Sequence, residues 1–263
     1  MYRVLLPVDT NVGRALHQAK YVGRLATVAD ELAATVLHVA PEWMNRHFSQ
    51  VEAASDAAEY LEEQGVDVTR VVAEGHVSRQ IVDHASERDC HEIVIGGRKR
   101  SGVTMVVLGS IVQDVLLSAD RPVTVTGKSR VSTADTYRIL LPVDTSEERA
   151  RDQAAYVAGL PNAADRAEVT VMYVQDSGAL DKFSENDAAV AAADTLADAG
   201  ISVDRVTAGG NVSPKIVSRA VNLGVDDIVM GGRKRSGIQK ALLGSTTQDV
   251  ILSDERPVTI TGS

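Results

Sequence analysis

The strongest constraint on the fold of this chain is an internal duplication. The heptapeptide G-G-R-K-R-S-G begins at Gly96 and again at Gly231, an offset of 135 positions (231 − 96). At that offset residues 2–128 align with residues 137–263 without a gap, and roughly half of the aligned positions are identical. A repeat of this length matches an ordinary globular domain rather than a solenoid unit. The sequence therefore predicts one domain at residues 1–128 and a second at residues 137–263, joined by a polar linker at residues 129–136.

Composition narrows the class of protein. The chain has 44% hydrophobic and 24% charged residues, which is typical of a folded, water-soluble protein. Its formal net charge of −9 disfavours general binding to nucleic acid or to an anionic membrane, because such binding needs clustered Lys and Arg. No apolar run approaches the ~20 residues of a membrane span, and the N-terminus lacks the apolar core of a signal peptide. We therefore expect a cytoplasmic protein that binds neither nucleic acid nor membrane.

Apolar runs alternate with helical patterns in each copy. The runs R-V-L-L-P-V-D and R-I-L-L-P-V-D, which begin at Arg3 and Arg138, are continuously apolar and end in an acid, as in strands buried on both faces of a parallel sheet. We expect side-chain caps at helix starts at Thr145, Ser78 and Ser213. The alternation of strand and helix predicts a Rossmann-like α/β domain in each copy, with a five-stranded, parallel, doubly wound sheet and helices on both faces.

Three features of each copy meet at the carboxyl ends of the predicted strands. An acid ends the first strand (Asp9 or Asp144), and a valine lies at the end of the second (Val39 or Val174). A Gly-rich loop follows the fourth strand and finishes in Gly-Ser at the start of a helix, where free backbone N–H groups suit an anion such as phosphate. Ligands of doubly wound sheets bind at this edge, so we expect the binding site there.

The motifs P-V-D, L-H-V, I-V-I-G-G, a spaced Gly-Ser and a closing R-P-V strand resemble those of the universal stress protein family. The resemblance covers nearly the whole of both copies, so the chain resembles a tandem universal stress protein. It implies a stress-response module that binds or senses an adenine nucleotide (ATP or AMP, with Mg²⁺ as a further ligand) and acts through conformational change or partner binding. By position it implicates Asp9, Val39, Gly96, Gly109 and Ser110 in copy one, and Asp144, Val174, Gly231, Gly244 and Ser245 in copy two.

One loop position departs from the family pattern. The second loop glycine of that pattern falls on Lys99 and on Lys234. A lysine restricts the positive φ and the close approach of backbone to phosphate that a glycine permits, whereas the charges of R-K-R can replace backbone contacts. Two functions therefore stay open: a nucleotide-binding module with both lysines in its sites, or a structural interaction protein that has lost ATP binding.

The two copies differ beside the Gly-Ser pair. Where copy two has Thr246, Thr247 and Lys240, copy one has Ile111, Val112 and Met105. Hydroxyl and ammonium groups donate hydrogen bonds to an anion, which Val and Ile cannot do. We therefore expect copy two to be the phosphate site, with Thr247 among its contacts.

No catalytic motif recurs in both copies. His38 is replaced by Tyr173 in copy two, and no Ser-His-Asp order, H-E-x-x-H or Walker motif is present. We expect a protein that is not an enzyme, with slow ATP hydrolysis as the alternative. The family resemblance also implies pairing through the last strands, residues 121–126 and 256–261, as a homodimer or as a pseudo-dimer within one chain, besides a protein partner whose identity the sequence does not give.

Overall fold

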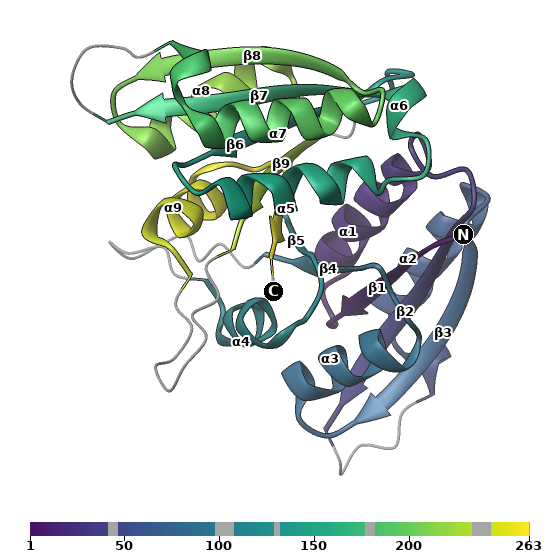
Figure 1. The fold of residues 1–263 in the computed structure, drawn as a ribbon. Coiled ribbons are helices and arrows are strands. Elements are labelled where there is room, and N and C mark those ends of the chain that lie inside the picture. The colour runs from purple at the N-terminus through teal and green to yellow at the C-terminus, as the bar shows by residue number, and fades with distance from the viewer. Residues whose placement is uncertain (42–46, 98–107, 129–131, 177–181, 233–242, 263) are drawn as a thin grey trace. The chain divides into compact units, whose positions relative to one another are not determined.

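The computed structural model describes residues 1–41, 47–97, 108–128, 132–176, 182–232 and 243–262. The chain divides into two compact units, unit 1 at Met1–Val131 and unit 2 at Ser132–Ser263, which Figure 1 draws as ribbons. The linker at residues 129–136 stays a prediction.

Unit 1 is a parallel, doubly wound α/β sheet. Its elements are β1 (Tyr2–Val8), α1 (Val12–Leu25), β2 (Leu32–Ala40), the short 3-10 helix η1 (Phe48–Gln50), α2 (Glu52–Glu63), β3 (Asp67–Glu74), α3 (Val77–Glu87), β4 (Glu92–Gly96), α4 (Ser110–Ser118) and β5 (Val123–Thr126). The strands pair in parallel in the order β3-β2-β1-β4-β5. Helix α1 packs beside α2, and α3 beside α4. Right-handed crossovers place these two helix pairs on opposite faces of the sheet.

Unit 2 repeats this architecture. Its elements are β6 (Tyr137–Val143), α5 (Glu147–Ala158), α6 (Ala163–Arg166), β7 (Ala167–Gln175), η2 (Phe183–Glu185), α7 (Asp187–Asp198), β8 (Ser202–Gly209), α8 (Val212–Leu223), β9 (Asp227–Gly231), α9 (Ser245–Ser253) and β10 (Val258–Thr261). The strand order is β8-β7-β6-β9-β10, again parallel. The predicted fold class is therefore confirmed for both copies.

The cores lie on both faces of each sheet. In β1 the apolar residues Val4, Leu5, Leu6 and Val8 are buried, because helices cover both sides of a central parallel strand. The Ala-rich helix α2 buries its small side chains, which allow a helix to approach the sheet closely. Helix α7 does the same in unit 2.

The neighbouring strands β1 and β4 pair with each other over only a short stretch. The β1–β2 ladder runs from Tyr2 to Val8, whereas the β1–β4 ladder comprises only the pairs that Val4 and Leu5 make. Beyond that ladder the buried amide of Gln18 bridges the strands, since its Nε2 donates to the carbonyls of Pro7 at 2.8 Å and of Val94 at 3.0 Å. The order of the strands reverses at this point, so a crevice is expected between their carboxyl ends.

The same bridge recurs in unit 2. There Gln153 of α5 donates to the carbonyls of Pro142 and Val229, both at 2.9 Å. Both units therefore hold the carboxyl ends of the two central strands with a buried glutamine.

The predicted helix caps were wrong. Helix α5 is capped by Ser146 instead of Thr145, because the Asp144 carboxylate accepts the Ser146 N–H at 2.8 Å and extends the turn by one residue. The cap residues of α3 and α8 are His76 and Asn211. Each lies two positions before the predicted cap, Ser78 or Ser213. Glycines with positive φ directly precede both caps and turn the chain early.

Candidate functional site

Unit 1 contains a pocket of about 390 Å³ at the carboxyl ends of β1, β2 and β4. The start of α4 and the side of α3 complete its wall. A cavity of this size falls within the ~300–1,000 Å³ range of small-molecule sites. The pocket therefore lies where a doubly wound sheet is expected to bind its ligand.

The structure brings the predicted residues of copy one together around this pocket. It is lined by Asp9, Val39, Gly96, Gly109 and Ser110, which are the five copy-one positions that the family resemblance implicated and that the structure describes. The sixth predicted position of copy one, Lys99, lies outside the described residues.

The walls of the pocket are largely apolar. Leu37 and Val39 contribute from β2, and Val77 and Ile81 from α3. Ile111, in the first turn of α4, also lines the pocket and keeps 39% of its surface exposed, which is unusual for a large apolar residue. An exposed isoleucine at the edge of a pocket suits contact with a ligand.

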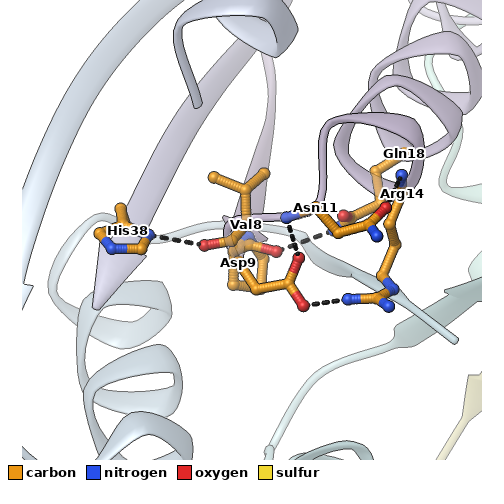
Figure 2. Close-up of polar contacts among 7 residues, drawn as sticks. Val8, Asp9, Asn11, Arg14, Gln18 and His38 are labelled. Carbon is orange, nitrogen blue, oxygen red and sulfur yellow. Dashed lines mark hydrogen bonds and ion pairs between the residues drawn. The ribbon is translucent and has the colours of Figure 1, made fainter. Parts of the chain in front are cut away.

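Asp9 follows β1 and is held by two neighbours (Figure 2). Its Oδ1 accepts the Asn11 N–H at 2.9 Å, and its Oδ2 accepts a hydrogen bond from Nη1 of Arg14 in an ion pair. Helix α1 begins just after this turn, since Asn11 caps it by accepting the Arg14 N–H at 2.9 Å. The carboxylate is therefore fixed at the mouth of the crevice between β1 and β4.

Arg14 also lines the pocket, although it was not among the residues predicted for the site. Its aliphatic stem lies across the α-carbon of Gly96, where a Cβ would overlap the Cγ and Cδ atoms of Arg14. The glycine is thus needed for this close approach, since the backbone at Gly96 has no positive φ. Recurrence of this arginine at position 149, with glycine again at 231, is the signal that could have identified it.

His38 is a further pocket residue that sequence reasoning set aside. It is 5% exposed, and its Nδ1 lies 3.0 Å from the carbonyl oxygen of Val8 (Figure 2). Because a carbonyl only accepts, Nδ1 carries the hydrogen of this contact. Copy two has Tyr173 at this position, so the imidazole distinguishes the two units.

The predicted residues of copy two lie at the corresponding ends of the strands in unit 2. Asp144 follows β6 and pairs with Arg149, whose Nη2 lies 2.6 Å from Oδ2. Val174 lies on β7 and Gly231 ends β9. Gly244 caps α9, whose first turn contains the last two predicted residues, Ser245 and Thr247.

The two hydroxyl residues predicted for the copy-two site differ in exposure. Thr247 is only 6% exposed, while Ser245 is exposed. Lys234, the remaining predicted residue of copy two, lies outside the described residues.

Two kinds of feature are not found in the described part of the chain. Its His, Cys, Asp and Glu side chains form no group of three or more that could hold a metal ion. None of its helices is long and apolar enough to cross a membrane.

Comparisons with known proteins agree with this architecture. The Bacillus subtilis universal stress protein YxiE is 28% identical over 108 residues, which are 39% of this chain and 73% of that protein. A crystal structure of a universal stress protein from Archaeoglobus fulgidus is similar with a TM-score of 0.70 and 22% identity, covering 98% of this chain and 97% of that chain. A Pseudomonas aeruginosa structure described as a universal stress protein has a TM-score of 0.67 and 22% identity, covering 99% of this chain and 93% of that one. At this identity the structural likeness shows a shared fold.

The family comparison extends over nearly the whole chain. The model described as the universal stress protein family matches twice, at residues 1–127 and 136–262. The chain therefore belongs to the universal stress protein family, with two domains of that family in tandem.

Proposed function

We propose that unit 1 binds an adenine nucleotide in its pocket and acts in the stress response as a sensor, through conformational change or partner binding rather than turnover. One observation carries the proposal. The copy-one positions that the family resemblance implicates, where described, all line the same 390 Å³ pocket. They come from the ends of two strands, from β2, and from the start of a helix, so their convergence follows from the fold.

The chemistry of the pocket suits the parts of a nucleotide. The partly exposed apolar side chains of Val39 and Val77 offer a surface for a flat base, and Asp9 offers carboxylate oxygens for hydroxyl groups. At the other end, Gly109 and Ser110 begin the nine-residue helix α4, whose first N–H groups lack partners within the helix and favour an anion. The base and the phosphate therefore each meet complementary groups.

This proposal places the ligand in copy one, whereas the hydroxyl groups of the sequence favoured copy two. Ile111 supports copy one, because it lines the pocket and keeps an exposed apolar surface that suits contact with a ligand. Thr247 supports copy two less than its sequence position indicated, because its side chain is buried. The preference between the copies can be tested with matched substitutions.

The test uses two variants of the full chain, Ile111→Glu in copy one and Thr246→Glu in copy two. Ile111 is exposed, so its replacement is expected to cost little stability. After removal of any copurified nucleotide, isothermal titration with AMP and ATP, with and without Mg²⁺, measures affinity. We expect Ile111→Glu to weaken binding at least about tenfold, by repelling phosphate and removing apolar contact. Thr246→Glu should leave the affinity unchanged.

Two results would reject the assignment. Loss of binding in Thr246→Glu but not in Ile111→Glu would move the site to copy two. An absence of heat with the nucleotide-free wild type would support the alternative, a structural interaction protein without nucleotide.

A further inference from the structure

We propose that Arg14 is a specificity-determining residue of the unit 1 pocket, which makes the pocket select a ligand with an anionic phosphoryl group over the uncharged nucleoside. The inference rests on the proposed function, since it concerns the ligand of the same site. It goes beyond the family resemblance, which implicates Asp9 and the loop but not this arginine.

The position of the Arg14 guanidinium is fixed before any ligand binds. Its backbone N–H is held by Asn11 at 2.9 Å in the first turn of α1. Its stem lies against Gly96, at a place where no larger residue would fit without displacing it. Its Nη1 is paired with Asp9. A cation held in this way loses little conformational entropy on binding, which favours affinity for a matching anion.

The charges around the pocket also favour an anion next to Arg14. Among the described lining residues, Asp9 and Arg14 are the ones with a formal charge, apart from the titratable His38. Asp9 already accepts from Asn11 and Arg14, so its negative charge is compensated where a phosphoryl group would otherwise be repelled. The start of α4, at Gly109 and Ser110, adds the positive end of a helix to the same pocket.

Arg14 retains hydrogen-bonding capacity beyond its pair with Asp9. A guanidinium has five N–H donors in a planar fork, and within the described residues one of these donors is used, by Asp9. The fork geometry matches two oxygens of a phosphoryl group. Arg14 can therefore hold Asp9 and contact a ligand oxygen at the same time.

A purely structural role explains this arrangement less well. The side chains of Arg14 and Asp9 are 23% and 36% exposed, and ion pairs that solvent reaches contribute little to stability. The alternative functional role is competition, in which Arg14 occupies Asp9 and must leave before a nucleoside binds. Removing the arginine should weaken AMP binding if Arg14 contacts the phosphoryl group, and should tighten adenosine binding if Arg14 competes for Asp9.

The experiment compares AMP with adenosine by isothermal titration into the full-length wild type, Arg14→Gln and Arg14→Lys. The matched control is Arg149→Gln, which removes the corresponding arginine of unit 2. We expect the wild type to prefer AMP, and Arg14→Gln to lower the ratio of AMP to adenosine affinity by about ten- to a hundredfold through loss of a charge-assisted hydrogen bond. Arg14→Lys should keep part of the preference, and Arg149→Gln all of it. Circular dichroism verifies that each variant is folded.

The failures of the two proposals are distinguishable. An unchanged ratio in Arg14→Gln, with AMP still bound, overturns the role of Arg14 and leaves the proposed function standing. Tighter adenosine binding in that variant with unchanged AMP binding overturns it in favour of competition for Asp9. A wild type that binds neither compound refutes the proposed function, and the inference with it.

Discussion

His91 lies between α3 and β4 and contacts two residues of the neighbouring strand β1. It lies next to β4, stacks on Tyr2 with ring centroids 5.0 Å apart, and accepts the Arg3 N–H through Nδ1 at 3.0 Å. Partial burial lowers the pKa of His91, and the positive charge of Arg3 lowers it further. In copy two Asp226 takes its place and accepts the Arg138 N–H at 2.9 Å. His91 in unit 1 and Asp226 in unit 2 thus accept a hydrogen bond from the equivalent backbone N–H.

This contact predicts a loss of stability in mild acid. Because the pKa of His91 is lowered in the folded protein, the unfolded chain takes up the proton first as the pH falls. The stability that His91 contributes is present above the ordinary histidine pKa of ~6.5. It is lost as the pH falls through the lower pKa that His91 has in the folded protein. His84, whose pKa burial also lowers, acts in the same direction. We expect the urea concentration at the midpoint of unfolding to be lower at about pH 5.5 than at about pH 7.5.

The matched variant is His91→Asp, which introduces the residue of copy two. It keeps an acceptor for Arg3 and does not titrate in this range, so its urea midpoint should fall less between the two pH values. Unfolding followed by circular dichroism measures both proteins. An equal fall in variant and wild type would contradict the role of His91.

The residues of the candidate site could be predicted only where a linear pattern marks them. Asp9, Gly109 and Ser110 stand at the ends of recognisable elements, so the topology places them at one edge. Arg14 and His38 could not be selected in this way, because their positions depend on contacts with Gly96 and Val8 that no local pattern shows. What the predicted residues bind stays a prediction.

At the scale of the element, the two helices that precede β4 and β9 end differently. In unit 2 Gly224 caps α8 in the left-handed conformation, with φ of 60°. In unit 1 the equivalent residue is Asp89, which adopts φ of 46°. A left-handed conformation costs a non-glycine residue about 1–2 kcal/mol, whereas glycine adopts it freely.

The difference predicts that Asp89→Gly stabilises unit 1. After allowance for the greater freedom of glycine in the unfolded chain, we expect a gain of about 0.5–1 kcal/mol in the free energy of unfolding. The backbone carbonyl of Asp89, which accepts from Nε of Arg3 at 2.9 Å, is kept in the variant. Thermal unfolding measures the shift, and Gly224→Asp is the reverse control, expected to destabilise unit 2. A destabilised Asp89→Gly protein would show that the aspartate side chain stabilises the turn by more than its backbone conformation costs.

The kinds and order of the main elements follow from their apolar runs, but the helix ends do not. Continuous apolar runs such as that of β1 can only be buried on both faces, which determines a central parallel strand. The start of α5 depends instead on the Asp144 side chain, which competes for a backbone N–H and moves the cap to Ser146. The four-residue helix α6 is too short to have a periodic pattern, so it was not predicted.

For the whole molecule, duplication gives two units of one fold whose pocket residues have diverged. Unit 1 has His38 and Ile111 where unit 2 has Tyr173 and Thr246. Both units keep the acid, the arginine and the glycine of the crevice, at positions 9, 14 and 96 in unit 1. This divergence is why the two units are expected to differ in nucleotide binding. Pairing through the last strands stays a prediction.

The most direct test of the central claim is a crystal structure of the full chain, grown after removal of copurified nucleotide and in the presence of AMP. We expect electron density for AMP in the unit 1 pocket, with the base against Val39 and Val77 and the phosphate between Arg14 and the start of α4. Density for AMP only at the strand ends of unit 2, or an empty unit 1 pocket at saturating AMP, would contradict it.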